Sequence, residues 1–281
     1  MRRAFVVGHP VKHSRSPLIH GHWLAEHGID GSYERIDVAP EDFGRFVATL
    51  REGDYAGGNV TLPHKEAAFA AVDRRTGRAE RLGAVNTLWF ENGELVGDNT
   101  DVTGFMAHLD ASLGAGWEAG VDTALVVGAG GAARGIVAGL QERALARILV
   151  TNRTPGKADD LVAAFRREVG PRLETLPWDE RDRAVAEAGL IVNTTSLGMA
   201  GQPPLDLSLA ATRDGAAVSD IVYVPLRTPL LAAAEARGLR IVDGLGMLLH
   251  QAAPGFARWF GVTPRVTPAL RALVEADISR A

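Results

Sequence analysis

A glycine-rich segment near the middle of the chain limits the possible folds more than any other feature. The apolar run at residues 124–127 predicts a buried strand, and the residues after it match the pattern G-x-G-x-x-A before an alanine-rich helix. In such a turn Gly128 allows the tight bend, Gly130 lets the backbone approach a pyrophosphate, and Ala133 lets the helix pack closely on the strand. The helix N-terminus adds free N–H groups and a partial positive charge. A glycine-rich turn of another α/β protein is the alternative, but a second apolar run at 147–151 has the spacing of a dinucleotide-binding unit.

The loop after the second predicted strand indicates which dinucleotide is bound. An NAD-selective site carries an acidic residue at this point, where it binds the ribose 2′-hydroxyl. This chain has no acidic residue there and offers Arg153, Thr154 and Lys157 instead. A guanidinium, a hydroxyl and an ammonium group suit a 2′-phosphate, so the loop predicts NADP as the cofactor. A solvated basic loop is the alternative.

Composition excludes several classes of protein. The chain has no cysteine, which excludes disulfides, thiolate metal sites and cysteine nucleophiles, and its 8 histidines lack metal-ligand spacing, so no metal is expected. The net charge of -4 gives no basic field for nucleic acid or a membrane surface. No apolar run reaches the roughly 18 residues of a membrane span, so we expect a cytoplasmic protein.

The order of predicted elements indicates an α/β fold with two domains, as the length of 281 residues also favours. The first 100 residues alternate between strands and helices and end in a hairpin with Asn92-Gly93 at its turn. From Thr123 onward the alternation resumes in a pattern typical of a parallel sheet. The predicted strands are 4–8, 33–38, 55–61, 84–90 and 95–98, then 123–127, 147–151, a short one near Thr175, 190–193, 217–222 and 239–242.

Two polar segments early in the chain are candidates for binding and catalysis. Ser14 and Ser16 lie in the loop after the first strand and could bind a polar ligand, although Ser16 could instead cap the following helix. Lys65 lies in the first turn of a helix predicted at 63–72, where the field of the helix favours the neutral amine and proton transfer. An ordinary solvated lysine is the alternative.

Three further polar segments follow predicted strands or lie within them. The run from Asp98 to Asp101 either caps the next helix or faces a ligand. Asn86 lies within the apolar strand predicted at 84–90, where a buried amide needs partners, so a core amide bonded to the backbone is its alternative. Residues 193–199 follow another apolar strand and are expected to line the same crevice as the glycine turn.

Taken together, these motifs resemble the shikimate dehydrogenases, NADP-dependent oxidoreductases of the aromatic amino-acid pathway. The resemblance runs from the first strand to Gln251 and beyond, and its departures are small, since His9 and Val224 each stand where Asn is usual. The segments that carry it are 8–17, 59–65, 83–87, 99–101, the glycine turn, 152–154, 193–196, Tyr223 and 244–251.

The resemblance implies a role for each matched position. Lys65 and Asp101 would form the acid–base pair of a reaction in which a hydride passes from NADPH to the C3 carbonyl of 3-dehydroshikimate. The residues that would hold shikimate are Ser14, Ser16, Thr61, Lys65, Asn86, Asp101, Tyr223 and Gln251. Those that would hold NADP are Gly128, Ala129, Gly130, Gly131, Ala132, Asn152, Arg153, Thr154, Lys157, Ile221, Gly244 and Met247.

The resemblance also implies how the chain is divided. A substrate domain of residues 1–102 plus 246–281 and a Rossmann-type NADP-binding domain of residues 103–245 would enclose a deep cleft, and the protein would act on its small-molecule substrate as a monomer or homodimer. Three alternatives stay open. They are a quinate/shikimate dehydrogenase with a broader substrate range or NAD use, a catalytically silent NADP-binding protein, and a folate-linked dehydrogenase of similar plan.

Overall fold

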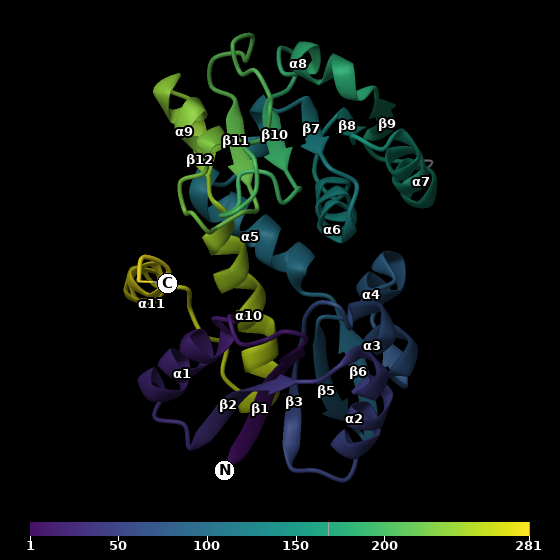
Figure 1. The fold of residues 1–281 in the computed structure, drawn as a ribbon, viewed down its shortest axis with the longest axis vertical. Coiled ribbons are helices and arrows are strands. Elements are labelled where there is room, and N and C mark those ends of the chain that lie inside the picture. The colour runs from purple at the N-terminus through teal and green to yellow at the C-terminus, as the bar shows by residue number, and fades with distance from the viewer. Residues whose placement is uncertain (168, 281) are drawn as a thin grey trace. The chain divides into compact units, whose positions relative to one another are not determined.

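The chain folds into two compact α/β units, which are described one at a time. The computed structural model describes residues 1–167 and 169–280. The first unit comprises Met1–Asp101 and Leu249–Ala281, and the second comprises Val102–Leu248 (Figure 1). Each unit contains one sheet, so the α/β class is confirmed.

The first unit is built on a mixed sheet with the strand order β2-β1-β3-β5-β6-β4. Strand β1 runs parallel to β2 and β3, whereas β5 runs antiparallel to both β3 and β6. The turn between β5 and β6 has positive φ at Asn92 and Gly93, as the Asn-Gly pair predicts. The strands are β1 (Arg2–Gly8), β2 (Gly31–Asp37), β3 (Tyr55–Val60), β4 (Arg74–Arg75), β5 (Thr87–Glu91) and β6 (Glu94–Asp98).

Helices cover both faces of this sheet. Phe43 and Val47 of α2 and Ala68 of α3 pack with Phe5 of β1 and Leu88 of β5 in one apolar core. The last part of the chain packs in the same unit: α1 and α11 lie side by side (Figure 1), and α10 supplies an indole N–H to the sheet. The helices are α1 (Ser16–Glu26), the 3₁₀ turn η1 (Pro40–Asp42), α2 (Phe43–Leu50), α3 (Lys65–Ala71), α4 (Gly77–Leu82), α11 (Pro268–Ile278) and α10 (Gly244–Phe260), which belongs to this unit from Leu249.

Two details of the first unit differ from the prediction. The strand predicted at 84–90 begins only at Thr87, so Asn86 precedes the strand instead of lying within it. The short elements β4 and α4 were not predicted, because a two-residue strand of Arg74 and Arg75 has no apolar pattern. Helix α4 is held largely by its ends, with Thr76 as a side-chain cap and Gly83 in the left-handed conformation.

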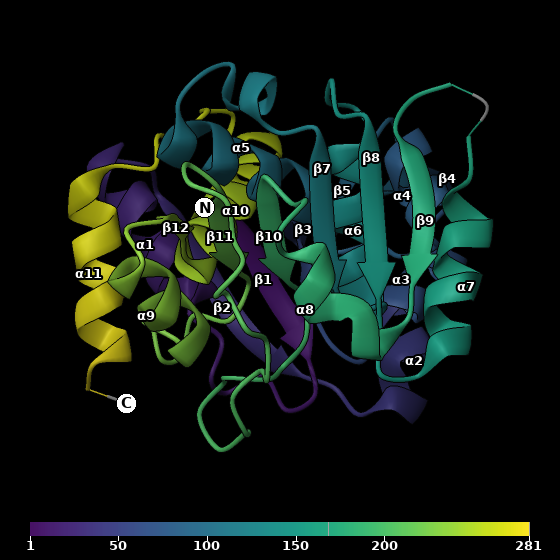
Figure 2. The ribbon, with the colours of Figure 1, turned by 90° about the horizontal axis from the view of Figure 1, so that it is seen from above.

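The second unit has a fully parallel sheet with the strand order β12-β11-β10-β7-β8-β9 (Figure 2). The chain moves outward from β7 through β8 to β9, then returns to β10 on the other side of β7, which is the reversal typical of a Rossmann-type fold. The strands are β7 (Thr123–Val127), β8 (Arg147–Thr151), β9 (Arg172–Leu176), β10 (Leu190–Asn193), β11 (Ala217–Asp220) and β12 (Arg240–Val242).

The helices of the second unit connect successive strands. Helix α6 follows β7 directly after the glycine turn, and α7 follows β8, so the predicted strand–turn–helix unit is confirmed. The helices are α5 (Asp101–Leu113, in this unit from Val102), η2 (Trp117–Gly120), α6 (Gly131–Leu140), α7 (Pro155–Phe165), η3 (Trp178–Glu180), α8 (Arg181–Ala184) and α9 (Pro229–Ala236).

A buried histidine links the stability of the first unit to pH. His20 of α1 is fully buried and its ring stacks on Tyr33 with 4.0 Å between ring centroids. Burial lowers the pKa of His20 to about 3, whereas an unfolded histidine titrates near 6.5. The unfolded chain therefore gains a proton at pH values where the native protein does not, so the stabilisation by neutral His20 is complete above about pH 6.5 and is lost as the pH falls toward 3.

Replacing His20 with Phe is expected to flatten this pH dependence. Between pH 7 and pH 5 the free energy of unfolding should fall by about 2 kcal/mol less in the His20→Phe variant than in the wild type. Urea unfolding followed by tryptophan fluorescence at the two pH values measures the difference, with the exposed His13→Gln variant as control. Equal pH dependence in His20→Phe and the wild type would contradict the assignment.

Candidate active site

The first sheet brings most of the candidate substrate residues to one edge. Strands β1, β3 and β6 end at this edge, and the antiparallel β5 begins there. Backbone hydrogen bonds fix the junctions: Val60 N–H donates to Asn86 O at 2.9 Å, and Asn86 N–H donates to Asp98 O at 2.9 Å. Segments far apart in the sequence therefore place polar side chains next to one another.

The central contact is an ion pair between the two predicted catalytic residues. Lys65 Nζ lies 2.6 Å from Asp101 Oδ2, and the two side chains are 26% and 25% exposed. Lys65 is the first residue of α3 and Asp101 is the first residue of α5. The amine is thus held by a carboxylate while water can still reach it, which suits a group that donates a proton and then regains one.

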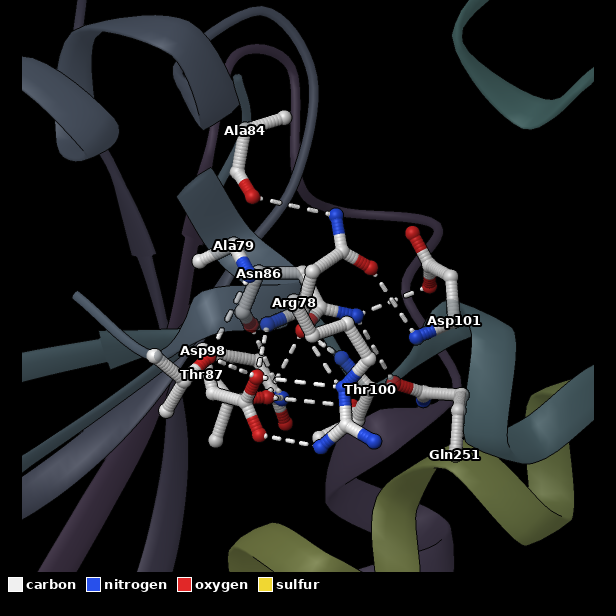
Figure 3. A network of polar contacts seen from close by, with 12 residues as sticks. Arg78, Ala79, Ala84, Asn86, Thr87, Asp98, Thr100, Asp101 and Gln251 are labelled. Atoms are coloured by element: carbon white, nitrogen blue, oxygen red, sulfur yellow. Dashed lines mark hydrogen bonds and ion pairs between the residues drawn. The ribbon is translucent and has the colours of Figure 1, made fainter. Parts of the chain in front are cut away.

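Asn86 orients the carboxylate of this pair. Its Nδ2 donates to Asp101 Oδ1 at 2.8 Å and to Gln251 Oε1 at 3.4 Å, and its Oδ1 accepts from Thr100 N–H at 2.8 Å (Figure 3). The side chain is buried, and Thr87 Oγ1 donates to the same oxygen at 2.8 Å. Asn86 is therefore a buried amide, as its alternative expected, with one side-chain bond to the backbone, at Thr100, and others to the side chains of Asp101, Gln251 and Thr87.

The two serines lie on the loop that follows β1. Ser16 is the first residue of α1, and its N–H donates to Ser14 Oγ at 3.3 Å. The N-cap position belongs to Arg15, which makes no side-chain cap bond, so the alternative that Ser16 caps the helix is wrong. Arg35 donates to Ser14 O at 2.6 and 2.9 Å and fixes the loop.

The remaining substrate candidates fall at different places. Thr61 follows β3 directly, and its N–H donates to Val7 O at 2.9 Å, which holds it at the same edge. Gln251 of α10 reaches this edge through its contact with Asn86. Tyr223 follows β11 in the second unit.

Sequence reasoning missed the polar residues beneath this edge. Tyr33 donates its hydroxyl to Asn59 Oδ1 at 2.6 Å, and Asn59 Nδ2 donates to Thr87 Oγ1 at 3.2 Å. Asn59 is buried in β3, so a polar residue near the end of an otherwise apolar strand was the available signal. These bonds hold β3 and β5 together just below Asn86.

The second unit contains a pocket of about 570 Å³ at the carboxyl ends of β7, β8 and β10. The predicted cofactor residues that line it are Gly128, Ala129, Gly130, Asn152, Arg153, Thr154 and Lys157. Thr194, Thr195 and Ser196 line it as well, as expected for the segment after β10. Sequence reasoning missed other lining residues, because they come from η3, α8 and a long loop with no binding motif: Trp178, Arg181, Gln202, Pro203, Pro204 and Asp206.

The glycine turn has the geometry that a pyrophosphate needs. Gly128 has φ +113, and a Cβ there would lie 2.4 Å from Thr194 Oγ1. Gly130, by contrast, precedes the first residue of α6 and has no atom within 4 Å of the position a Cβ would take. The helix N-terminus is therefore open on the side of Gly130, and Arg153 and Lys157 add exposed positive charge to the same pocket. These features fit NADP.

The other predicted cofactor residues are not among those that line this pocket. Gly131 and Ala132 form the first turn of α6. Gly244 begins α10, and a Cβ there would lie 2.2 Å from Ile221 O, so only glycine allows this approach of two backbones. Met247 follows in the first turn of α10.

The part of the chain that the structure describes contains neither a metal-binding cluster nor a membrane-spanning helix. Within residues 1–167 and 169–280, no group of three or more His, Asp or Glu side chains is placed to hold a metal ion. None of the helices in that part of the chain is both long enough and apolar enough to span a bilayer.

The comparisons with known proteins all indicate the same family. Residues 6–88 match the shikimate dehydrogenase substrate binding domain, residues 116–199 match shikimate / quinate 5-dehydrogenase, and residues 244–274 match the shikimate 5′-dehydrogenase C-terminal domain. The shikimate dehydrogenase (NADP(+)) of Methylobacterium radiotolerans is 61% identical over 279 residues, which cover 99% of this chain and 98% of the relative. That of Azorhizobium caulinodans is 55% identical with the same coverage.

Solved structures agree with the sequence matches. Shikimate 5-dehydrogenase from Thermus thermophilus, in complex with NADP(H) and shikimate, has a TM-score of 0.84 and 37% identity and covers 100% of this chain and 99% of its own. Quinate dehydrogenase from Corynebacterium glutamicum, in complex with NAD, has a TM-score of 0.88 and 27% identity and covers 99% of this chain and 98% of its own. With relatives this similar over nearly its whole length, the chain belongs to the shikimate dehydrogenase family.

Proposed function

We propose that this protein catalyses the reversible, NADP-dependent reduction of 3-dehydroshikimate to shikimate, a step of aromatic amino-acid biosynthesis. The observation that carries the proposal is the 2.6 Å contact between Lys65 and Asp101. Lys65 lies within residues 6–88, which match the substrate binding domain, and Asp101 belongs to the same unit. A catalytically silent NADP-binding protein would have no need to hold an amine and a carboxylate together at the sheet edge. The enzyme is proposed to work in the cytoplasm as a monomer or homodimer.

The residues of the second unit bind and orient the cofactor. The open N-terminus of α6 receives the pyrophosphate, and Arg153, Thr154 and Lys157 bind the 2′-phosphate. When bound, NADPH supplies the hydride that is added to the substrate. The remaining proposed contacts with NADP come from Gly128, Ala129, Gly130, Gly131, Ala132, Asn152, Ile221, Gly244 and Met247.

Lys65 performs the proton transfer that accompanies the hydride. As the C3 carbonyl carbon gains a hydride, its oxygen gains negative charge, and the Lys65 ammonium donates a proton to that oxygen to give the alcohol. Asp101 holds Lys65 in place through Oδ2, while Asn86 fixes its other oxygen. In the reverse direction Lys65 accepts the proton from the hydroxyl of shikimate.

The other substrate contacts are proposed by residue type and position. Hydroxyl and amide groups suit the three hydroxyls and the carboxylate of shikimate, and most of them lie at the same sheet edge as Lys65. These residues are Ser14, Ser16, Thr61, Asn86 and Gln251. Tyr223 is assigned to the substrate by the family resemblance alone.

A four-way initial-rate assay tests the proposed function. Shikimate or quinate is combined with NADP⁺ or NAD⁺, and reduction of the cofactor is followed by absorbance. We expect shikimate with NADP⁺ to give the highest kcat/KM, because the pocket presents Arg153 and Lys157 and no acidic side chain at the end of β8. Activity mainly with quinate and NAD⁺ would replace the proposal with the quinate alternative, and no reduction with either substrate would favour a silent binding protein.

A further inference from the structure

A second acidic side chain lies just before the catalytic aspartate and is almost fully used in hydrogen bonds. Asp98 is the last residue of β6, and its side chain is 11% exposed. Its Oδ2 accepts from Arg78 Nη2 at 2.6 Å, and its Oδ1 accepts from Arg78 Nε at 3.2 Å and from Thr76 Oγ1 at 2.5 Å (Figure 3). Burial raises the pKa of Asp98, but the bonds from Arg78 and Thr76 outweigh burial and lower it overall, so this carboxylate is charged at neutral pH.

The bonds of Asp98 continue into the turn that carries Asp101. Asn99 N–H donates to Asp98 Oδ1 at 2.7 Å. The Asn99 side chain joins the segment before β5 to the start of α5, because its Nδ2 donates to Ala84 O at 3.2 Å and its Oδ1 accepts from Asp101 N–H at 3.1 Å. Figure 3 shows Asp98, Asn86 and Asp101 joined in one network. The main chain that presents the Asp101 carboxylate is thus held at consecutive residues from Asp98 onward.

We infer that Arg78 and Asp98 are positioning residues for the reaction, which fix the turn at residues 99–101 so that Asp101 meets Lys65. This inference rests on the proposed catalytic role of the Lys65–Asp101 pair. Neither residue acts on substrate in this scheme, because both act through Asn99. The expected consequence is a loss of turnover that exceeds any loss of stability or of cofactor binding, since small misplacements of catalytic groups reduce rates strongly.

A second arginine–aspartate pair, which contacts the other end of β6, supplies a control. Asp73 also accepts two bonds from one arginine, at 2.8 Å each from Arg51, and one backbone bond, from Leu95 N–H at 2.8 Å. Leu95 lies at the start of β6, whereas Asp98 ends it. In both pairs one arginine binds both carboxylate oxygens, but Asp73 is 36% exposed whereas Asp98 is 11% exposed, and Asp73 bonds the start of β6 instead of its end.

The test compares Asp98→Asn with Asp73→Asn in the full chain. With the substrate and cofactor that the four-way assay selects, Asp98→Asn is expected to lower kcat by at least about tenfold with KM for the cofactor within about twofold of wild type. Asp73→Asn is expected to keep kcat within about twofold of wild type, even where its melting temperature falls, because Asp73 does not bond the turn at residues 99–101. Equal kcat in Asp98→Asn and the wild type, or an equal loss in both variants, would overturn the inference.

Variants of the more exposed partner keep the test valid if Asp98→Asn folds poorly. Arg78→Gln should lower kcat in the same direction, and Arg78→Lys should restore part of it, because an ammonium group retains the charge but not the two-point bond. If both Arg78→Gln and Arg78→Lys keep the wild-type kcat, the positioning role is contradicted. Failure of the proposed function is separate, because it shows in the wild type and in Lys65 variants.

Discussion

Replacing Lys65 with Ala is expected to lower kcat for shikimate oxidation by about 10³-fold, within the range of general acid–base catalysis, while KM for shikimate rises only a few fold. The amine lies 2.6 Å from Asp101 Oδ2, and its removal takes away the proposed proton carrier but leaves the other polar groups of the sheet edge in place. A partly exposed ion pair adds little to stability, so the variant should fold normally. Steady-state rates with saturating NADP⁺ measure the effect.

The variant Lys65→Arg separates proton transfer from charge. Arginine keeps a positive group beside Asp101, but it does not release a proton near neutral pH. We expect Lys65→Arg to lose nearly as much turnover as Lys65→Ala, and the exposed Lys12→Ala to lose none. Near-normal kcat in Lys65→Ala would remove Lys65 from the catalytic role, whereas full activity in Lys65→Arg would assign it a purely electrostatic one.

The second unit could be predicted well because its signals are local. Its buried parallel strands are short apolar runs bounded by polar or glycine residues, and strands β7, β8 and β10 were predicted with the bounds that the structure has. The glycine turn depends on neighbouring residues alone, so the opening of α6 near Gly130 was also predictable. Arg153 and Lys157 could be predicted to line the pocket because they directly follow β8 in the sequence.

The parts that escaped prediction depend on contacts between distant residues. Arg78 and Asp98 are 20 positions apart, and neither β4 nor α4 has a pattern long enough to indicate that they meet. The return of α10 to the first unit rests on contacts such as the 2.7 Å bond from Trp259 Nε1 to Leu88 O, for which no local pattern exists. Only the family resemblance indicated that return. Trp178 and Arg181 line the cofactor pocket by the same kind of non-local packing.

Replacement by alanine is expected to destabilise the protein at one glycine of the turn and to leave its stability nearly unchanged at the other. Gly128→Ala should destabilise the protein by about 3 kcal/mol, because φ +113 is strained for alanine and its Cβ would lie 2.4 Å from Thr194 Oγ1 and 3.0 Å from Thr195 Cγ2. Gly130→Ala should leave stability nearly unchanged, because Gly130 has φ −87 and nothing lies within 4 Å of the position of a Cβ. Urea unfolding curves measure both.

Cofactor binding then tests whether a pyrophosphate occupies the open space beside Gly130. If a pyrophosphate approaches the N-terminus of α6 there, the methyl group of Gly130→Ala occupies its path, and KM for NADP⁺ should rise by about tenfold or more while KM for shikimate stays near the wild-type value. Any loss of activity in Gly128→Ala should follow the fraction of the protein that is unfolded. A Gly130→Ala variant with the wild-type KM for NADP⁺ would mean that the pyrophosphate does not approach the helix at Gly130. A Gly128→Ala variant as stable as the wild type would contradict the packing of the turn against Thr194, because a Cβ at Gly128 would lie 2.4 Å from Thr194 Oγ1.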